Sequence, residues 1–216
     1  MLLAIDTATQ NASVALYDAQ QVWAERTWFS ERNHTVEVMP AIAEMLAGLS
    51  LAPAALKGVA VAVGPGSFTG MRVGLSAAKG FGLALNIPVI GIPTLDVVAQ
   101  PFADGRLPVC AVVHAGRGRF CAAMYGRQRG KWARLSDFRL ASPAELPAGI
   151  TERTLFCGEL DDEARQAVQS ALGDKALFAS PAQSVRRAAV LAELAWERAV
   201  AGRGDDLALL APIYIH

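Results

Sequence analysis

Residues 58–85 read GVAVAVGPGSFTGMRVGLSAAKGFGLAL and combine an apolar run, a glycine-rich loop and a segment rich in small residues. A strand, a glycine loop and a helix in this order can present free helical N–H groups to a phosphate. A P-loop would end in Gly-Lys-Ser/Thr, but Lys79 lies between Ala78 and Gly80. The dinucleotide fingerprint G-x-G-x-x-G also fails, because Thr69 stands at its last glycine. The loop therefore needs another explanation.

The composition is that of a globular protein without a bias toward nucleic acid or membranes. The 216-residue chain is 53% hydrophobic, 19% charged and formally neutral. Asp6 interrupts the first apolar run, no cleavage site follows it, and no run reaches the roughly 18 apolar residues of a membrane span, so we expect neither a signal peptide nor a membrane segment. Cys110, Cys121 and Cys157 lack metal-binding spacing, which favours a reducing, cytoplasmic location.

The predicted elements repeat one mixed pattern, strand-strand-strand-helix-strand-helix-strand. The first copy comprises strands at 2–7, 12–18, 21–29, 58–63 and 88–92 and helices at 35–49 and about 68–85. The second comprises strands at 109–115, 119–126, 131–138, 154–158 and 176–180 and helices at 160–172 and 183–203, with a Pro-broken stretch in place of its first helix. A boundary near residues 101–108 predicts an α/β protein of two similar lobes, 1–103 and 104–216, facing a cleft. Pro40 is expected to kink the first helix or to mark its start.

The duplicated order resembles the two-lobed actin-like (ASKHA) fold of sugar kinases and Hsp70-type chaperones. In that fold the turn after the first strand approaches phosphate, and that turn is DTATQN here. The resemblance makes Asp6, Thr7 and Ser67 candidate nucleotide-facing residues. A capping role for Asp6 in a tight turn is an equally good interpretation.

Three stretches make the resemblance more specific. They are LLAIDTATQNASVALYD (2–18), NHTVEVMPAIAEML (33–46) and the segment from VGPGSFTG to PTLD (63–96). Together they resemble the TsaB family, bacterial proteins required to form threonylcarbamoyladenosine in tRNA, and GPGSFTG with the following RVGL and AKG is the most specific part. HAGRGRFCAAMY and the terminal APIYIH are weaker matches, because His114, Gly116 and His216 replace residues usual in the family.

The resemblance implies a noncatalytic scaffold that activates the related catalytic subunit TsaD, in an assembly that also contains the ATPase TsaE and acts on tRNA. It also implies a homodimer when TsaD is absent. TsaD binds its metal through a His-Met-Glu-Gly-His run, and the matching residues 94–98 read TLDVV. Both histidines are replaced, so we expect no metal and no other cofactor.

Two helices carry more apolar surface than one sheet face can bury. In the helix after the glycine loop, Gly70 and Gly74 also remove side-chain bulk, so that another backbone can come close, at about 1 kcal/mol each in helix propensity. We therefore predict that GPGSFTG leads into a docking helix, although both helices could instead simply pack on their own sheet. The predicted partner interface comprises Glu37, Met39, Ile42, Met45, Gly70, Met71, Arg72, Gly74, Leu75 and Lys79, with Met39, Ile42, Met71 and Leu75 at its apolar centre.

Two further hypotheses concern ligands. Between Arg106 and Arg139 the chain has eight Lys or Arg and a single acid, Asp137, so Arg127, Arg129 and Lys131 are candidate tRNA contacts, or merely a solvated hairpin. The rival function is a nucleotide-binding enzyme of actin-like or Rossmann type that uses the Gly64–Gly74 loop, for which a looser G-x-G-x-x-x-G match remains. It would need a general base, and Asp6 and Asp96 are the candidates.

Overall fold

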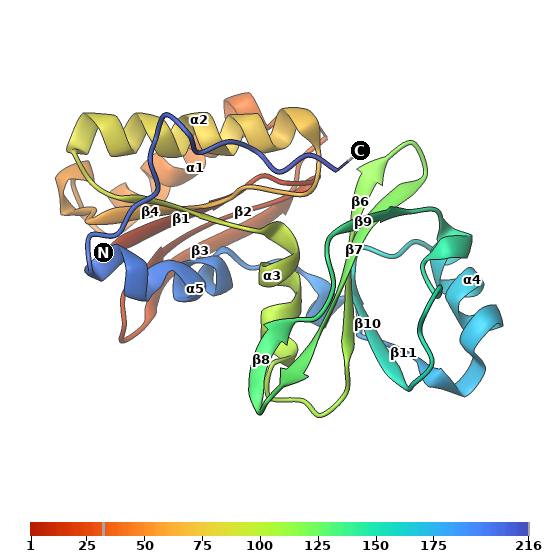
Figure 1. Ribbon diagram of the computed structural model, residues 1–216. Coiled ribbons are helices and arrows are strands. Elements are labelled where there is room, and N and C mark those ends of the chain that lie inside the picture. Colours follow the sequence, from red (N-terminus) through yellow and green to blue (C-terminus); the bar gives the residue numbers. More distant parts are fainter. Residues whose placement is uncertain (32, 216) are drawn as a thin grey trace. The chain divides into compact units, whose positions relative to one another are not determined.

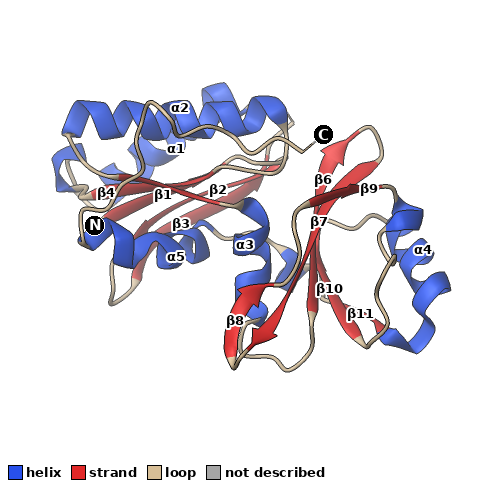
Figure 2. Ribbon diagram, viewed as in Figure 1, coloured by secondary structure: helices blue, strands red, loops and turns tan. Residues whose placement is uncertain are grey.

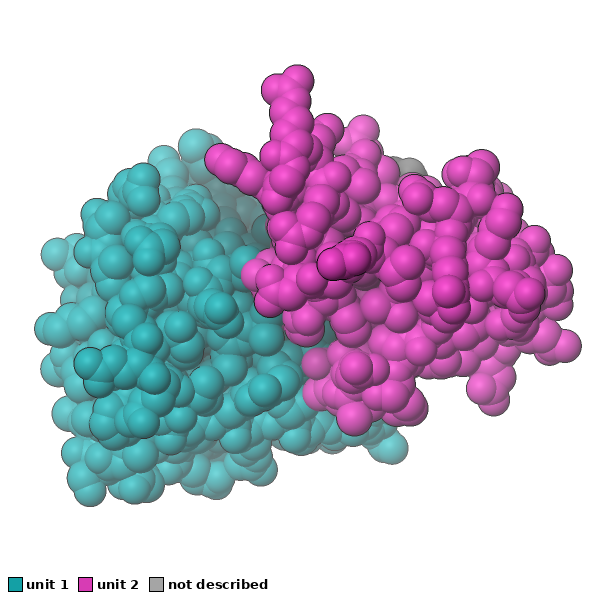
Figure 3. Space-filling view, turned by 90° about the horizontal axis from the view of Figure 1, so that it is seen from below, with its two compact units in different colours: residues 1–94, 186–213 teal, residues 95–185, 214–216 magenta. Residues whose placement is uncertain are grey.

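The computed structural model describes residues 1–31 and 33–215. The chain forms two compact units, unit 1 of Met1–Thr94 with Arg186–Ile213 and unit 2 of Leu95–Val185 with Tyr214–His216, coloured separately in Figure 3. Each unit is built on its own β-sheet (Figures 1 and 2).

Unit 1 contains a five-stranded sheet between helices. Its strands are β1 (Leu2–Asp6), β2 (Asn11–Tyr17), β3 (Val22–Phe29), β4 (Gly58–Ala62) and β5 (Val89–Ile92), in the order β3-β2-β1-β4-β5. The first three form an antiparallel meander, and β1, β4 and β5 are parallel. Helices α1 (His34–Gly48) and α2 (Phe68–Leu85) cover one face, and α5 (Ala188–Val200) covers the other (Figure 1).

Unit 2 contains a second mixed sheet. Its strands are β6 (Val109–Gly116), β7 (Arg119–Gln128), β8 (Lys131–Arg134), β10 (Thr154–Gly158) and β11 (Ala176–Phe178), in the order β11-β10-β6-β7-β8, with β9 (Arg139–Ala141) paired to β7. Alternate residues of β6 enter two cores, since Val109 packs in one cluster with Leu95 of α3 (Thr94–Ala99), while Cys110 packs in the other with Ala164 of α4 (Asp162–Leu172).

The two sheets confirm the duplication predicted from the sequence, because their strands follow the same order, with β6, β7, β8, β10 and β11 corresponding to β1 to β5. The helix after the fifth strand of each copy belongs largely to the other unit: α3 to unit 2 and α5 to unit 1. Alanine and leucine side chains of α5 are buried, and α5 packs on β1 and β2. The contacts therefore divide the chain differently from the predicted lobes 1–103 and 104–216.

One predicted helix boundary is wrong, and one of the two predicted roles of Pro40 is excluded. The helix expected at 183–203 spans only Ala188–Val200, because Arg186 turns into the interior and the N-cap Arg187 is extended. Helix α1 begins at His34 and continues through Pro40, so Pro40 does not mark its start.

Arg186 is buried in an ion pair that ties the segment before α5 to the turn after β1. Its Nε donates to Asp6 Oδ2 at 3.0 Å, and its Nη2 donates to Thr9 Oγ1 at 2.6 Å and to the Asn11 carbonyl at 2.8 Å. The side chains of Asp6 and Arg186 are 0% and 1% exposed. The other Asp6 oxygen accepts from Ala8 N at 2.9 Å, so Asp6 does cap a tight turn.

Gly70 and Gly74 of α2 and Gly66 of the loop before it allow a close approach to this same turn. A Cβ at Gly66 would collide with the Ala8 carbonyl, and a Cβ at Gly70 or Gly74 would collide with backbone or side-chain oxygen of Thr7. Thr7 Oγ1 donates to the Gly70 carbonyl at 2.7 Å. The expectation that these glycines admit a partner's backbone is therefore wrong, because the backbone that approaches belongs to the chain itself.

Gly74→Ala should destabilise unit 1, because the added methyl group has no space beside Thr7. We expect a loss of about 1 to 3 kcal/mol in the free energy of unfolding, measured by urea titration with circular dichroism. Gly80→Ala in the same helix is the control, since nothing lies within 4 Å of its Cβ position, and it should gain about 0.5 to 1 kcal/mol. Equal stability of the two variants would contradict this account.

Arg186→Met should lower the free energy of unfolding by about 3 to 5 kcal/mol, because it leaves the buried Asp6 carboxylate without its cation. The double variant Asp6→Asn with Arg186→Met should recover part of that loss, as a double-mutant cycle in urea would show. Arg187→Met is the matched control, because that side chain is 57% exposed in its pair with Glu25 and should cost at most about 1 kcal/mol. Additive losses from the Asp6 and Arg186 substitutions would refute the coupling.

Candidate docking groove

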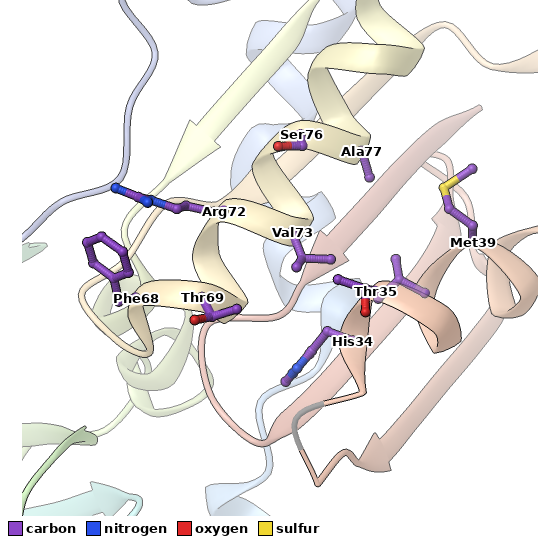
Figure 4. A pocket seen from close by; sticks show the side chains of 10 residues that line it. His34, Thr35, Met39, Phe68, Thr69, Arg72, Val73, Ser76 and Ala77 are labelled. Atoms are coloured by element: carbon purple, nitrogen blue, oxygen red, sulfur yellow. The ribbon is translucent and has the colours of Figure 1, made fainter.

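A groove of about 460 Å³ runs between α1 and α2 on the side of the two helices that faces away from the sheet (Figure 4). Both helices contribute to its walls, and Val73 of α2 faces Thr35 of α1 across it. The lining residues are His34, Thr35, Val38 and Met39 from α1 and Phe68, Thr69, Arg72, Val73, Ser76 and Ala77 from α2.

The turn between β1 and β2 positions the start of both helices. On the α1 side, His34 Nε2 donates to the Thr9 carbonyl at 2.9 Å. On the α2 side, Ser67 N donates to the Ala8 carbonyl at 2.6 Å, and Ser67 Oγ caps the helix by accepting from Gly70 N at 3.3 Å. The groove is therefore held by a turn that the buried Asp6–Arg186 pair itself holds in place.

The rim of the groove is apolar with a cationic edge. Met39 is 48% exposed and Phe68 is 53% exposed. The Arg72 guanidinium carbon lies 3.6 Å from the centre of the Phe68 ring, which is a cation–π contact. Thr35, Thr69 and Ser76 also line the groove and contribute hydroxyl groups. Such a surface suits an apolar partner with acidic groups at its edge.

The structure separates the predicted interface residues into two sets. Only Met39 and Arg72 line the groove, whereas Ile42, Met71 and Leu75 are buried in the chain's own interior and are not available to a partner. Gly70 and Gly74 are buried against Thr7, and Met45 packs against the core. Lys79 is half-buried.

Sequence reasoning missed Phe68 and Val73. A signal for them exists in the helical spacing, because Phe68, Arg72 and Ser76 recur every fourth residue and therefore share one helix face. Phe68 is also the first residue after the Ser67 cap, where a large apolar side chain has no preceding turn to pack on.

Two acidic side chains of α1 already have partners within unit 1. Glu44 pairs with Arg26 of β3 at 2.7 Å, and Glu37 accepts from the Trp28 indole at 2.9 Å. Hydrogen bonds from the Ser30 hydroxyl and the Trp28 indole hold the pKa of Glu37 below its ordinary value. Glu37, one of the predicted interface residues, and Glu44 are therefore both engaged by residues of unit 1.

The candidate nucleotide-facing residues are engaged by the chain itself. Asp6 and Thr7 are buried, and Ser67 caps α2. The second candidate base, Asp96, accepts from the Tyr125 hydroxyl at 2.6 Å, and burial raises its pKa. The chain itself fills the space beside the loop glycines, since a Cβ at Gly64 would meet Met71 and Ile213 and a Cβ at Gly66 would meet the Ala8 carbonyl.

The thiols are unsuited to nucleophilic chemistry. Burial raises the pKa of Cys110 to about 12 and that of Cys121 to about 11, so both are protonated at neutral pH. Across residues 1–31 and 33–215, no three His, Cys, Asp or Glu side chains gather as metal ligands would. None of the described helices combines the length and apolar character needed to cross a bilayer.

The second unit holds the remaining predicted residues. Arg127, Arg129 and Lys131 surround the turn between β7 and β8, and all three are exposed. His114 is exposed at the end of β6, where its backbone N donates to Glu159 Oε2 at 3.1 Å, and Gly116 has a positive φ of 77°. His216 lies outside the described residues.

Comparisons with known proteins agree on one family. The family model of TsaD, tRNA N6-adenosine threonylcarbamoyltransferase, matches residues 28–200. The tRNA threonylcarbamoyladenosine biosynthesis protein TsaB of Bacillus subtilis (strain 168) is 30% identical over 220 residues, covering 99% of this chain and 93% of that protein.

Solved structures extend the comparison to the whole fold. YeaZ from Pseudomonas aeruginosa is 25% identical, with a TM-score of 0.74 over 99% of both chains. A chain of the AlfA filament bound to AMPPNP is only 8% identical but has a TM-score of 0.51 over 93% of this chain and 98% of that one, in agreement with the actin-like fold predicted from the sequence. The extent of the Bacillus match, together with the family model, shows that the chain belongs to the TsaB family.

Proposed function

We propose that the chain is a noncatalytic, activating subunit of a cytoplasmic complex that forms threonylcarbamoyladenosine in tRNA, and that it docks a TsaD-family catalytic subunit through the α1–α2 groove. The names of its relatives support the pathway. The observation that carries the docking is the groove with its half-exposed Met39 and Phe68. TsaE joins the same assembly in this proposal, and tRNA is reached through the complex.

The TsaD family model supports this choice of surface. It matches residues 28–200, which include all of α1 and α2, so a TsaD-family protein should carry equivalent helices. Two related helix pairs can then pack face to face, and about 800 Å² per partner is typical of a specific interface. Met39 and Phe68 would anchor it, and Arg72 would favour a partner with an acid at the matching place.

The noncatalytic role is supported by the engagement of the candidate catalytic groups. Asp6 is neutralised by Arg186, and Asp96 is hydrogen-bonded to Tyr125. The alternative function, a nucleotide-binding enzyme that uses the Gly64–Gly74 loop, gains no support, because residues of the chain itself occupy the space beside its glycines.

The same groove should also pair two copies of the chain when the catalytic subunit is absent. A second copy presents the same exposed Met39 and Phe68, so a twofold contact is self-complementary. Repulsion between the two copies of Arg72 should make this homodimer weaker than the heterodimer. We expect Phe68→Glu to shift the homodimer to monomer in sedimentation experiments, and an unchanged dimer would place the contact elsewhere.

Met39→Glu combined with Phe68→Glu should weaken binding to the TsaD-family protein of the same organism at least about tenfold, because two apolar anchors become charges that must be desolvated. Calorimetric titration of the purified proteins measures the effect. A glutamate at position 68 lies in the first turn of α2, where its negative charge interacts favourably with the helix dipole, so α2 should remain folded.

Leu83→Glu is the matched control, because Leu83 belongs to the same helix and is 73% exposed but does not line the groove. It should bind the partner as the unchanged protein does. Full affinity of the folded groove variant, or an equal loss in the Leu83 variant, would place the docking surface elsewhere.

A further inference from the structure

The charges of unit 2 are segregated along the chain. The segment from Arg106 to Arg139, which forms β6, β7 and β8, has eight Lys or Arg and one acid. Residues 140–185, which include β10, α4 and β11, have three Lys or Arg and seven acids. Because the whole protein is formally neutral, this excess of cations is a local property of the β6–β8 meander.

The turn between β7 and β8 concentrates these cations at the end of a narrow hairpin. Arg127 pairs across the hairpin with Trp132, and Gln128 pairs with Lys131. Arg129 and Gly130 form the turn with positive φ values of 51° and 80°, which match a type I′ turn. Asparagine or glycine is the usual residue at such a position, so the chain carries a cation where a small residue would be less strained.

The three cationic side chains at this turn, Arg127, Arg129 and Lys131, differ in their contacts with the protein. Arg127 is held by the protein, because its two terminal nitrogens donate to the carbonyls of Gly130 at 3.0 Å and Ala103 at 3.2 Å. The side chains of Arg129 and Lys131 are exposed and form no hydrogen bond or ion pair with any residue that the structure describes. Arg127 therefore braces the turn, while the other two cations remain directed to solvent.

The base of the hairpin is rigid. The ring of Trp132 stacks on that of Tyr125, with centroids 6.2 Å apart and planes 21° apart, and the Tyr125 hydroxyl donates to Asp96. Further along β8, Arg134 lies over the Phe138 ring at 4.1 Å. The neighbouring loop adds Asp104 and Arg106, which offset one another. The braced backbone of the turn therefore loses little conformational entropy when it meets an anionic polymer.

We propose that the β7–β8 turn contacts the phosphate backbone of tRNA through Arg129 and Lys131, with Arg127 as a positioning residue. This inference rests on the proposed function, which brings tRNA to the complex. Two neighbouring cations on an exposed turn can bind phosphate groups, and such binding does not depend on the base sequence. The contact then contributes to the affinity for tRNA in general, and not to the choice of one tRNA.

The other end of β7 provides an internal comparison. The turn between β6 and β7 also has an Arg-Gly pair, Arg117 and Gly118, followed by Arg119, with φ values of 55° and 66° in the pair. The carboxylate of Glu159 lies beside this end of β6, where it accepts from His114 N. The β7–β8 turn has no acid hydrogen-bonded to its strands near the tip among the described residues. We therefore assign the contact to the β7–β8 end.

The test compares two double variants of equal charge change. Arg129→Asn with Lys131→Thr removes the two cations, and asparagine is favoured in a type I′ turn, so the hairpin should fold. Arg117→Asn with Arg119→Thr makes the same change at the other end of β7. Each protein is first assembled with its TsaD-family partner, and the affinity of the complex for tRNA is measured by fluorescence anisotropy between about 50 and 200 mM salt.

The first variant should lower the affinity about tenfold and reduce the slope of log affinity against log salt by about 1 to 2, with partner binding unchanged. The second should leave both quantities as in the unchanged protein. An unchanged slope in the first variant, or an equal reduction in both, would overturn the assignment.

Failure of the proposed function has a different signature. If the unchanged chain does not bind the TsaD-family protein, the docking proposal is wrong. The same salt titration on the chain alone then shows whether Arg129 and Lys131 contact tRNA. If the complex forms and binds tRNA with a slope that the Arg129 and Lys131 changes do not alter, docking stands and the hairpin contact is wrong.

Discussion

The buried pair of Asp6 and Arg186 is the interaction on which the arrangement of unit 1 depends. Its partners lie far apart in the sequence, and their side chains are almost completely removed from water. Taking both charges out of water is costly, and hydrogen bonds to Thr9, Asn11 and the Ala8 N–H offset part of that cost. The geometry of the β1–β2 turn is thereby specified by charge as well as by packing.

That turn in turn positions both walls of the groove. The Thr9 carbonyl accepts from His34 at the start of α1, and the Ala8 carbonyl accepts from Ser67 at the start of α2. A substitution of Arg186 should therefore alter the shape of the proposed docking groove, although Arg186 itself does not line the groove. The same turn would approach phosphate in an actin-like ATPase, and here its carboxylate is neutralised from within the chain.

The two units divide the proposed work. Unit 1 offers an apolar groove with a single cation stacked on an aromatic ring, which suits a folded protein surface. Unit 2 offers a braced turn with exposed cations, which suits a polyanion. A formally neutral chain can serve both because its charges are segregated along the sequence.

The sequence by itself determined the duplicated order of strands and helices along the chain, because alternation, helical spacing and turn residues are local signals. The actin-like fold and the family followed from its resemblance to known proteins. The sequence could not show what approaches Gly66, Gly70 and Gly74, since a missing side chain admits any backbone, and only the tertiary structure showed that Thr7 and Ala8 take that space. It also assigned Ile42, Met71 and Leu75 to a partner, because a wide apolar face looks the same whether its own sheet or another protein covers it. The exchange of α3 and α5 between the units and the burial of Arg186 were decided by contacts between residues distant in the chain, which no local pattern encodes.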